Sequence, residues 1–130
     1  RVLFRSDVKQ GDYHAITEEI KALKAICGEK ILKVIIEACS LTKDEKVELC
    51  HCVTEGGADF IKTSTGFGSG GATLEDVQLF KKHIGPHVQI KAAGGIRSVE
   101  AMKAYIEAGC TRIGASAAVG LLQNRLDEQV

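Results

Sequence analysis

The sequence contains no tryptophan, a single proline and no excess of either charge, with 17 Lys and Arg residues against 17 Asp and Glu residues. A neutral balance does not favour a surface for polyanions, so nucleic acid is not an expected partner. No apolar run approaches the roughly 20 residues of a membrane-spanning helix, so no membrane partner is expected. Hydrophobic residues make up 45% of the 130 residues. That share is typical of one globular domain and too high for a disordered chain.

The cysteines match neither a zinc-binding spacing nor a redox Cys-x-x-Cys pair. An odd number of cysteines without such a pattern indicates reduced thiols, which are typical of cytoplasmic proteins. The histidines form no metal-ligand set either. We therefore expect a cytoplasmic protein with no bound metal. The residues concerned are Cys27, Cys39, Cys50, Cys52, Cys110, His14, His51, His83 and His87.

Apolar, β-branched runs alternate with helical patterns along the chain, which favours parallel strands joined by helical crossovers. Helix signals include a capping box at Thr42–Glu45 and a cap at Ser98. We predict strands over 31–38, 58–64, 88–92 and 111–116, and helices over 12–27, 42–54, 73–85, 98–109 and 121–129.

Residues 55–64 and 107–116 resemble each other and lie two strand–helix units apart. Such a repeat suits a (β/α)8 TIM barrel, whose units are geometrically equivalent, although a doubly wound sheet uses the same local units. A complete barrel needs about 250 residues. We therefore expect an α/β chain of the TIM-barrel family that is truncated to a half-barrel with about four parallel strands.

Three lysines lie within or at the end of predicted strands, namely Lys33, Lys62 and Lys91. Barrel enzymes place their chemistry at the carboxyl ends of strands. If Lys62 and Lys91 face the same side on adjacent strands, their mutual repulsion and partial burial lower at least one pKa. A neutral amine is a nucleophile that can form a Schiff base with an aldehyde.

Glycines follow the same strands, at Gly66, at Gly94-Gly95 and before Ser116. Backbone N–H groups exposed by glycine near a helix start suit a phosphate group. Barrels often bind phosphate beside their last two strands, where Gly94, Gly95 and Ser116 fall. The hydroxyl of Ser116 and the charge of Arg97 add to this predicted phosphate site.

Four stretches, at residues 32–37, 57–67, 91–97 and 112–116, closely resemble deoxyribose-phosphate aldolase in order and spacing. The resemblance implies a class I aldolase on a (β/α) barrel that reversibly cleaves 2-deoxy-D-ribose 5-phosphate to D-glyceraldehyde 3-phosphate and acetaldehyde without a cofactor. It implies that Lys62 is the Schiff-base lysine and Lys91 the lysine that tunes it. It also implies supporting roles for Lys33 and Thr65 and phosphate contacts from Gly66, Gly94, Gly95 and Ser116.

Two departures accompany the resemblance. The family's acid/base aspartate lies on the strand before residue 12, where this chain has Arg1-Val-Leu-Phe-Arg-Ser6, and Asp7 is not at the equivalent place. These six residues resemble a translated sequencing adapter, so we expect residues 1–6 to be a non-native start and residues 7–130 to be the C-terminal half of the aldolase domain. Ala117 stands where the family often has a second serine.

The resemblance leaves alternatives open. A fragment without the first four strands and the aspartate is expected to have little or no aldolase activity. It could instead be a non-catalytic half-barrel that binds phosphate or self-associates through its open sheet edges. Another class I aldolase of phosphorylated sugars is a third reading, which the Lys62 and Lys91 spacing disfavours. Small phosphorylated sugars and aldehydes are the expected partners, and the homo-oligomeric state stays open.

Overall fold

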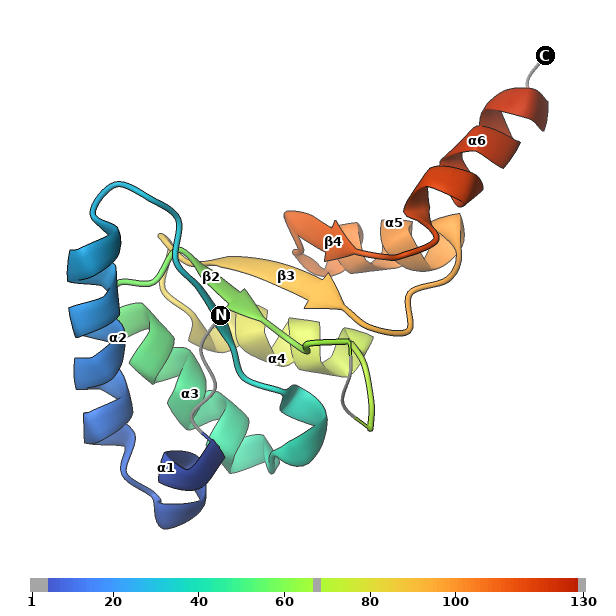
Figure 1. The fold of residues 1–130 in the computed structure, drawn as a ribbon. Coiled ribbons are helices and arrows are strands. Elements are labelled where there is room, and N and C mark those ends of the chain that lie inside the picture. The colour runs from blue at the N-terminus through green and yellow to red at the C-terminus, as the bar shows by residue number, and fades with distance from the viewer. Residues whose placement is uncertain (1–4, 67–68, 129–130) are drawn as a thin grey trace.

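The computed structural model describes residues 5–66 and 69–128, and for residues 5–7 and 125–128 it describes the backbone alone. Helices and strands alternate through most of this part of the chain, as the sequence pattern predicts (Figure 1). In chain order the elements are α1 (Arg5–Gln10), α2 (Tyr13–Cys27), β1 (Lys33–Ile35), the 3-10 helix η1 (Ala38–Ser40), α3 (Lys43–Glu55), β2 (Phe60–Lys62), α4 (Leu74–His83), β3 (Gln89–Ala93), α5 (Val99–Ala108), β4 (Arg112–Gly114) and α6 (Ala118–Glu128).

The four strands form one sheet in the order β1-β2-β3-β4, and each neighbouring pair is parallel. Strand order therefore follows chain order, with no reversal of the kind that divides a doubly wound sheet. Because parallel crossovers are right-handed, this order keeps successive helices on the same face of the sheet. The predicted half-barrel with four parallel strands is confirmed.

The register aligns the side chains of the four strands in rows. Lys62 on β2 is paired with Lys91 on β3, and Lys91 is paired with Arg112 on β4. Residues at one register position of parallel strands point to the same face, and successive residues alternate. In the adjacent row, Val34 and Ile61 are fully buried in the hydrophobic core. The row that holds the lysines therefore faces the opposite side, which is the inner side of a barrel.

The helices cover the outer face of the sheet and pack on one another in chain order, α2 on α3, α3 on α4 and α4 on α5 (Figure 1). Ile16 and Ile20 of α2 and Val77 and Phe80 of α4 are fully buried between these helices and the sheet. Burying a side chain of this size contributes about 1.5–3 kcal/mol before entropy losses. This core fixes the strands that carry the lysines.

Helix starts agree closely with the sequence signals. Asp12, Thr42, Thr73 and Ser98 each accept a hydrogen bond from a backbone N–H of the first helical turn. The Thr42 N–H donates in turn to the Glu45 carboxylate, which completes the predicted capping box. Each cap is worth about 1 kcal/mol.

Strand lengths and the N-terminal region differ from the predictions. The strand predicted over 31–38 is regular only over Lys33–Ile35, because Glu37 adopts a left-handed conformation with φ 51° and starts the turn of η1. The helix α1 was not predicted, and α6 begins at Ala118 rather than at residue 121. Residue 129 of that predicted helix lies outside the described residues, as do residues 1–4 of the predicted non-native start.

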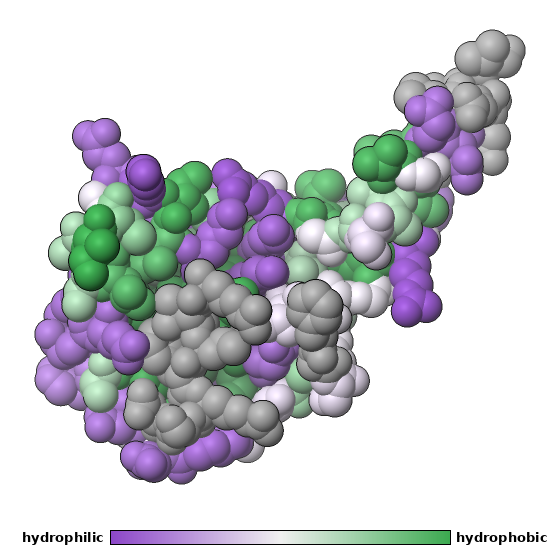
Figure 2. Space-filling view, viewed as in Figure 1, coloured by the Kyte–Doolittle hydropathy of each residue, from purple (hydrophilic) through white to green (hydrophobic). Residues whose placement is uncertain are grey.

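Helix α6 projects away from the rest of the chain (Figure 1). Figure 2 shows hydrophobic surface on this arm, and Val119 and Leu122 of α6 are 82% and 54% exposed. The described part of the chain therefore leaves apolar side chains of α6 without cover. None of the described helices combines the length and the apolar character needed to cross a membrane.

Candidate active site

The two central lysines share a cavity at the carboxyl ends of the strands. Lys62 is the last residue of β2 and Lys91 lies within β3, so the Lys62–Lys91 pairing brings both side chains to the same face. Both line a cavity of about 440 Å³. The same cavity is lined by five further predicted residues, namely Thr65, Gly66, Gly94, Gly95 and Ser116, and by Arg97.

Electrostatics single out Lys91. Partial burial is the largest cause of a lowered pKa for the Lys91 ammonium group, followed by the positive charges of Lys62, Lys33 and Arg112. All three charges oppose protonation of Lys91. The sequence predicts that the lysine pair lowers at least one pKa, and the lowered pKa belongs to Lys91.

The third lysine lies outside the cavity. Lys33 is paired with Phe60, two register positions closer to the strand starts than Lys62. In the same region the Arg112 guanidinium lies over the Phe60 ring, 4.7 Å from its centre, and Thr111 donates a hydrogen bond to the Gln89 side chain at 2.8 Å. Lys33 therefore reaches the site through its charge on Lys91, and not as part of the cavity wall.

Close approach of two loops builds the glycine-lined wall. A Cβ atom at Gly71 would collide with the carbonyl oxygen of Gly94, so only glycine fits there. The Ala72 N–H donates to the carbonyls of Ala93 and Gly94, both at 3.1 Å, and the Tyr105 hydroxyl donates to the Ala72 carbonyl at 2.8 Å. These bonds tie the loop after β2 to the end of β3. The wall therefore presents main chain, which suits a phosphate group.

The phosphate-site residues predicted after β3 and β4 line the same cavity. Gly95 and Arg97 lie in the loop that leads to α5, and Ser116 follows β4. All three are exposed at the cavity mouth. The two amines therefore line the same cavity as main-chain, hydroxyl and guanidinium donors.

One residue at the site was not singled out from the sequence. The Glu37 carboxylate, just beyond β1, accepts hydrogen bonds from the backbone N–H and the hydroxyl of Thr65. The available signal was its place at the end of a strand in the stretch 32–37. No periodicity shows that its carboxylate turns toward the next strand.

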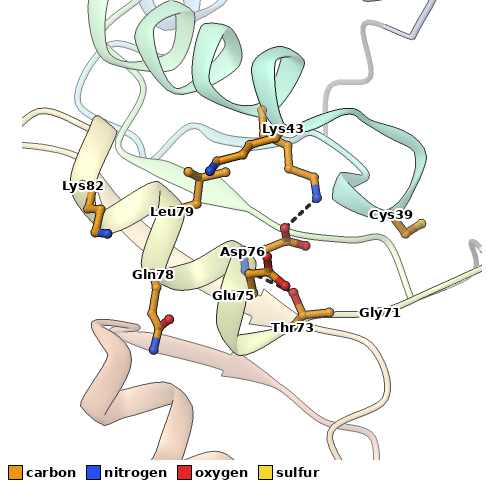
Figure 3. A pocket seen from close by; sticks show the side chains of 10 residues that line it. Cys39, Lys43, Gly71, Thr73, Glu75, Asp76, Gln78, Leu79 and Lys82 are labelled. Carbon is orange, nitrogen blue, oxygen red and sulfur yellow. Dashed lines mark hydrogen bonds and ion pairs between the residues drawn. The ribbon is translucent and has the colours of Figure 1, made fainter.

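A second cavity of about 370 Å³ is lined by residues of η1, α3, α4 and the loop before α4 (Figure 3), and neither Lys62 nor Lys91 lines it. Lys46 donates to Asp76 at 2.7 Å there, and both side chains are largely buried. None of the predicted site residues lines this cavity. Within residues 5–66 and 69–128 no cluster of His, Cys, Asp and Glu side chains could hold a metal ion.

A parallel sheet in sequential strand order, with a cavity at the carboxyl ends of its strands, defines a half-barrel of the TIM-barrel enzyme class. A sequence model of the DeoC/LacD family aldolases matches residues 2–126. The chain therefore belongs to the DeoC/LacD family of aldolases, and the resemblance seen in the sequence is confirmed.

Known relatives agree with this assignment. The chain is 64% identical over 118 residues to the deoxyribose-phosphate aldolase of Clostridium botulinum (strain Eklund 17B / Type B), covering 91% of this chain and 53% of that protein. The solved structure of QR15, an aldolase, has a TM-score of 0.89 at 37% identity and covers 98% of this chain and 58% of that one. A tetrameric deoxyribose phosphate aldolase from Aeropyrum pernix has a TM-score of 0.72 at 30% identity, covering 91% and 50%.

The chain spans about half the length of the curated relatives that it matches, 53% and 54% for two of them. Its four strands correspondingly make up half of an eight-stranded barrel.

Proposed function

We propose that this chain is the part of a class I aldolase that carries its Schiff-base lysine. The complete barrel would reversibly cleave 2-deoxy-D-ribose 5-phosphate to D-glyceraldehyde 3-phosphate and acetaldehyde. The observation that carries the proposal is the register pairing of Lys62 with Lys91 in one cavity. The names of two relatives, both deoxyribose-phosphate aldolases, support the same substrate. The 130-residue chain by itself is expected to turn over little or no substrate.

In the proposed reaction the neutral amine of Lys62 adds to the aldehyde carbon of the open-chain sugar, and loss of water gives an iminium ion. Cleavage of the bond between C2 and C3 sends its electron pair into the iminium, which becomes an enamine. The C3 hydroxyl loses its proton to a base and becomes the aldehyde of D-glyceraldehyde 3-phosphate. Protonation of the enamine carbon and hydrolysis release acetaldehyde and restore Lys62.

Lys91 has two tasks in this scheme. Its positive charge faces Lys62 across the paired strands, where it would tune the nucleophile. Its own lowered pKa lets it donate or accept a proton at a pH where an ordinary lysine stays charged. The acid/base carboxylate that the resemblance implies would come from the other half of the barrel.

The phosphate of the sugar would bind where glycine main chain, Ser116 and Arg97 line the cavity. Gly66, Gly94 and Gly95 are supported as main-chain donors because they line the cavity with left-handed backbones, at φ 90°, 91° and 73°. Ser116 and Arg97 would add a hydroxyl and a positive charge. No cofactor takes part in this scheme.

We also propose a cellular location and an oligomeric state for the complete protein. All five cysteines are unpaired, which suits the cytoplasm. The tetrameric relative and the exposed apolar side chains of α6 support a homo-oligomer as the working form.

The experiment is reduction with borohydride in the presence of acetaldehyde, followed by peptide mass spectrometry. The proposal expects an ethyl adduct on Lys62, and none in Lys62→Met. The matched control is Lys103→Met, which removes an exposed lysine of α5 and should leave the adduct on Lys62. Equal labelling of Lys62 and Lys103 in the wild-type chain would mean that neither amine is activated, and the proposal would fail.

A second candidate function is a phosphate-binding half-barrel without catalysis that self-associates. The observation in its favour is the sheet itself, whose outermost strands β1 and β4 each have one partner within the described residues. Such edges invite pairing with another chain. Sedimentation velocity with and without inorganic phosphate tests it: a dimer that binds phosphate and forms no adduct on Lys62 would favour this candidate over the aldolase.

A further inference from the structure

Glu37 has an unusual backbone. Its φ of 51° and ψ of 63° place it in the left-handed region, and it is the one non-glycine residue with positive φ in the described part of the chain. A side chain with a Cβ atom adopts this conformation at a cost in free energy. Such strain persists where the surrounding structure fixes it, and it often accompanies functional sites.

The surroundings of Glu37 do fix it. The Ile36 N–H donates to the Lys62 carbonyl at 3.1 Å, and the Ala38 N–H donates to the Thr63 carbonyl at 2.8 Å. The backbone on both sides of Glu37 is therefore bonded to the end of β2, although regular strand geometry has stopped at Ile35. The left-handed residue sits between two anchored neighbours.

The carboxylate of Glu37 is bound to a residue of the cavity wall. One oxygen accepts from the Thr65 N–H at 3.2 Å, and the other accepts from the Thr65 hydroxyl at 2.8 Å. Hydrogen bonds to a charged carboxylate are roughly twice as strong as neutral ones. Two bonds to one residue also fix its orientation, because they hold its main chain and its side chain together.

The orientation of Thr65 affects the wall of the cavity. It lies three residues after Lys62 and directly before Gly66, and all three line the cavity. The bonds to Glu37 fix the peptide that precedes Thr65 and the Thr65 side chain, which limits the directions that the following Gly66 N–H can take. No carboxylate lines the cavity within the described residues, so Glu37 contacts the lining residue Thr65 without lining the cavity itself.

We propose that Glu37 is a positioning residue for the Thr65–Gly66 segment: its left-handed backbone aims the carboxylate, and the carboxylate holds Thr65 so that the segment is ready for a phosphate group. Glu37 touches no substrate in this scheme. The inference rests on the proposed function for the identity of the ligand group, and inorganic phosphate serves as its probe.

The test is a double-mutant cycle on the full chain, with Glu37→Gln and Thr65→Val, and with phosphate affinity measured by amide NMR titration of Gly66 and Gly94. Each single variant is expected to weaken phosphate binding about tenfold, the effect of losing one charged hydrogen bond. The double variant is expected to match the single ones, because both remove the same interaction. Thr65→Ser should restore most of the affinity that Thr65→Val loses.

Two further variants separate positioning from general stability. Glu37→Gly removes the carboxylate but relieves the left-handed strain, so its melting temperature should fall less than that of Glu37→Gln while phosphate binding weakens as much. A merely structural Glu37 would lower the melting temperature and leave phosphate affinity alone. Glu75→Gln, which removes an exposed carboxylate of α4, is the matched charge control and should leave the phosphate affinity of the wild type.

The outcomes separate this inference from the aldolase proposal. If the wild-type chain binds phosphate and the effects of Glu37→Gln and Thr65→Val simply add, the inference is overturned while the acetaldehyde adduct on Lys62 can still form. If the wild-type chain does not bind phosphate, the inference also falls. If the cycle shows coupling but no adduct forms, the positioning role stands and the aldolase proposal fails.

Discussion

Replacing Gly71 by alanine tests the close approach that builds the cavity wall. The Cβ of Gly71→Ala would collide with the carbonyl carbon and oxygen of Gly94, and neither of these backbone atoms can move without disturbing β3. Overpacking of this kind costs about 1–3 kcal/mol. Because Gly71 does not have a positive φ, the cost is steric and not conformational.

Gly95→Ala is the matched control for this prediction. Gly95 has a φ of 73° and nothing within 4 Å of a built Cβ, so its cost is conformational and about 1 kcal/mol. Thermal unfolding followed by circular dichroism compares the two variants. We expect Gly71→Ala to be the less stable one, with a melting temperature lowered by roughly 3–15 °C. A Gly71→Ala variant as stable as Gly95→Ala would show that the two loops do not meet as described.

Three other predictions concern charge and thiols. Lys91→Met should stabilise the fold at neutral pH, because the pKa of Lys91 is lower in the folded chain and its protonation therefore favours the unfolded chain. Urea unfolding measured against pH should show that this gain in stability disappears as the pH rises past the ordinary lysine pKa. Lys46→Met should cost about 2–4 kcal/mol in urea unfolding, because it leaves the Asp76 carboxylate buried without its ion pair, and a loss below about 0.5 kcal/mol would contradict this. Exposed Cys39 should react with a thiol reagent in the native chain, whereas Cys50, with its pKa raised to about 12 by burial, should react only after unfolding.

The alternation of helices and strands was predictable because local signals are strong. Capping residues such as Thr42 and Ser98 act within one helical turn, and β-branched runs mark the buried strands. The sequential order of the strands did not follow from these local units, because a doubly wound sheet shares them; it was expected from the resemblance to a barrel family. The limits of the strands were less predictable, because the end of β1 depends on the left-handed backbone of Glu37, which the neighbouring strand holds.

The site was predictable in its central pair and less so around it. Period-two alternation showed which neighbours share a side with each lysine within its own strand, but the common face and the direct pairing of Lys62 and Lys91 required the register. Lys33 falls outside the cavity, because it is the first residue of β1 and is paired with Phe60, two residues before Lys62. The role of Glu37 depends on a contact 28 residues away along the chain, which no local pattern reports.

The non-native origin of residues 1–6 stays a prediction. The family match begins at residue 2, and the described structure begins at residue 5 with α1. Sequencing the parent DNA upstream of the Asp7 codon would test it: a continuous native coding region with its own start codon would contradict the adapter origin.

The most direct test of the account is an NMR titration of the Lys91 side-chain ammonium in the wild-type chain and in Lys62→Met. We expect a Lys91 pKa below the ordinary lysine value in the wild type. That pKa should rise in Lys62→Met, because the positive charge of Lys62 has been removed. A Lys91 pKa that is the same in both proteins would mean that the two amines do not share a cavity, and it would contradict the proposed chemistry.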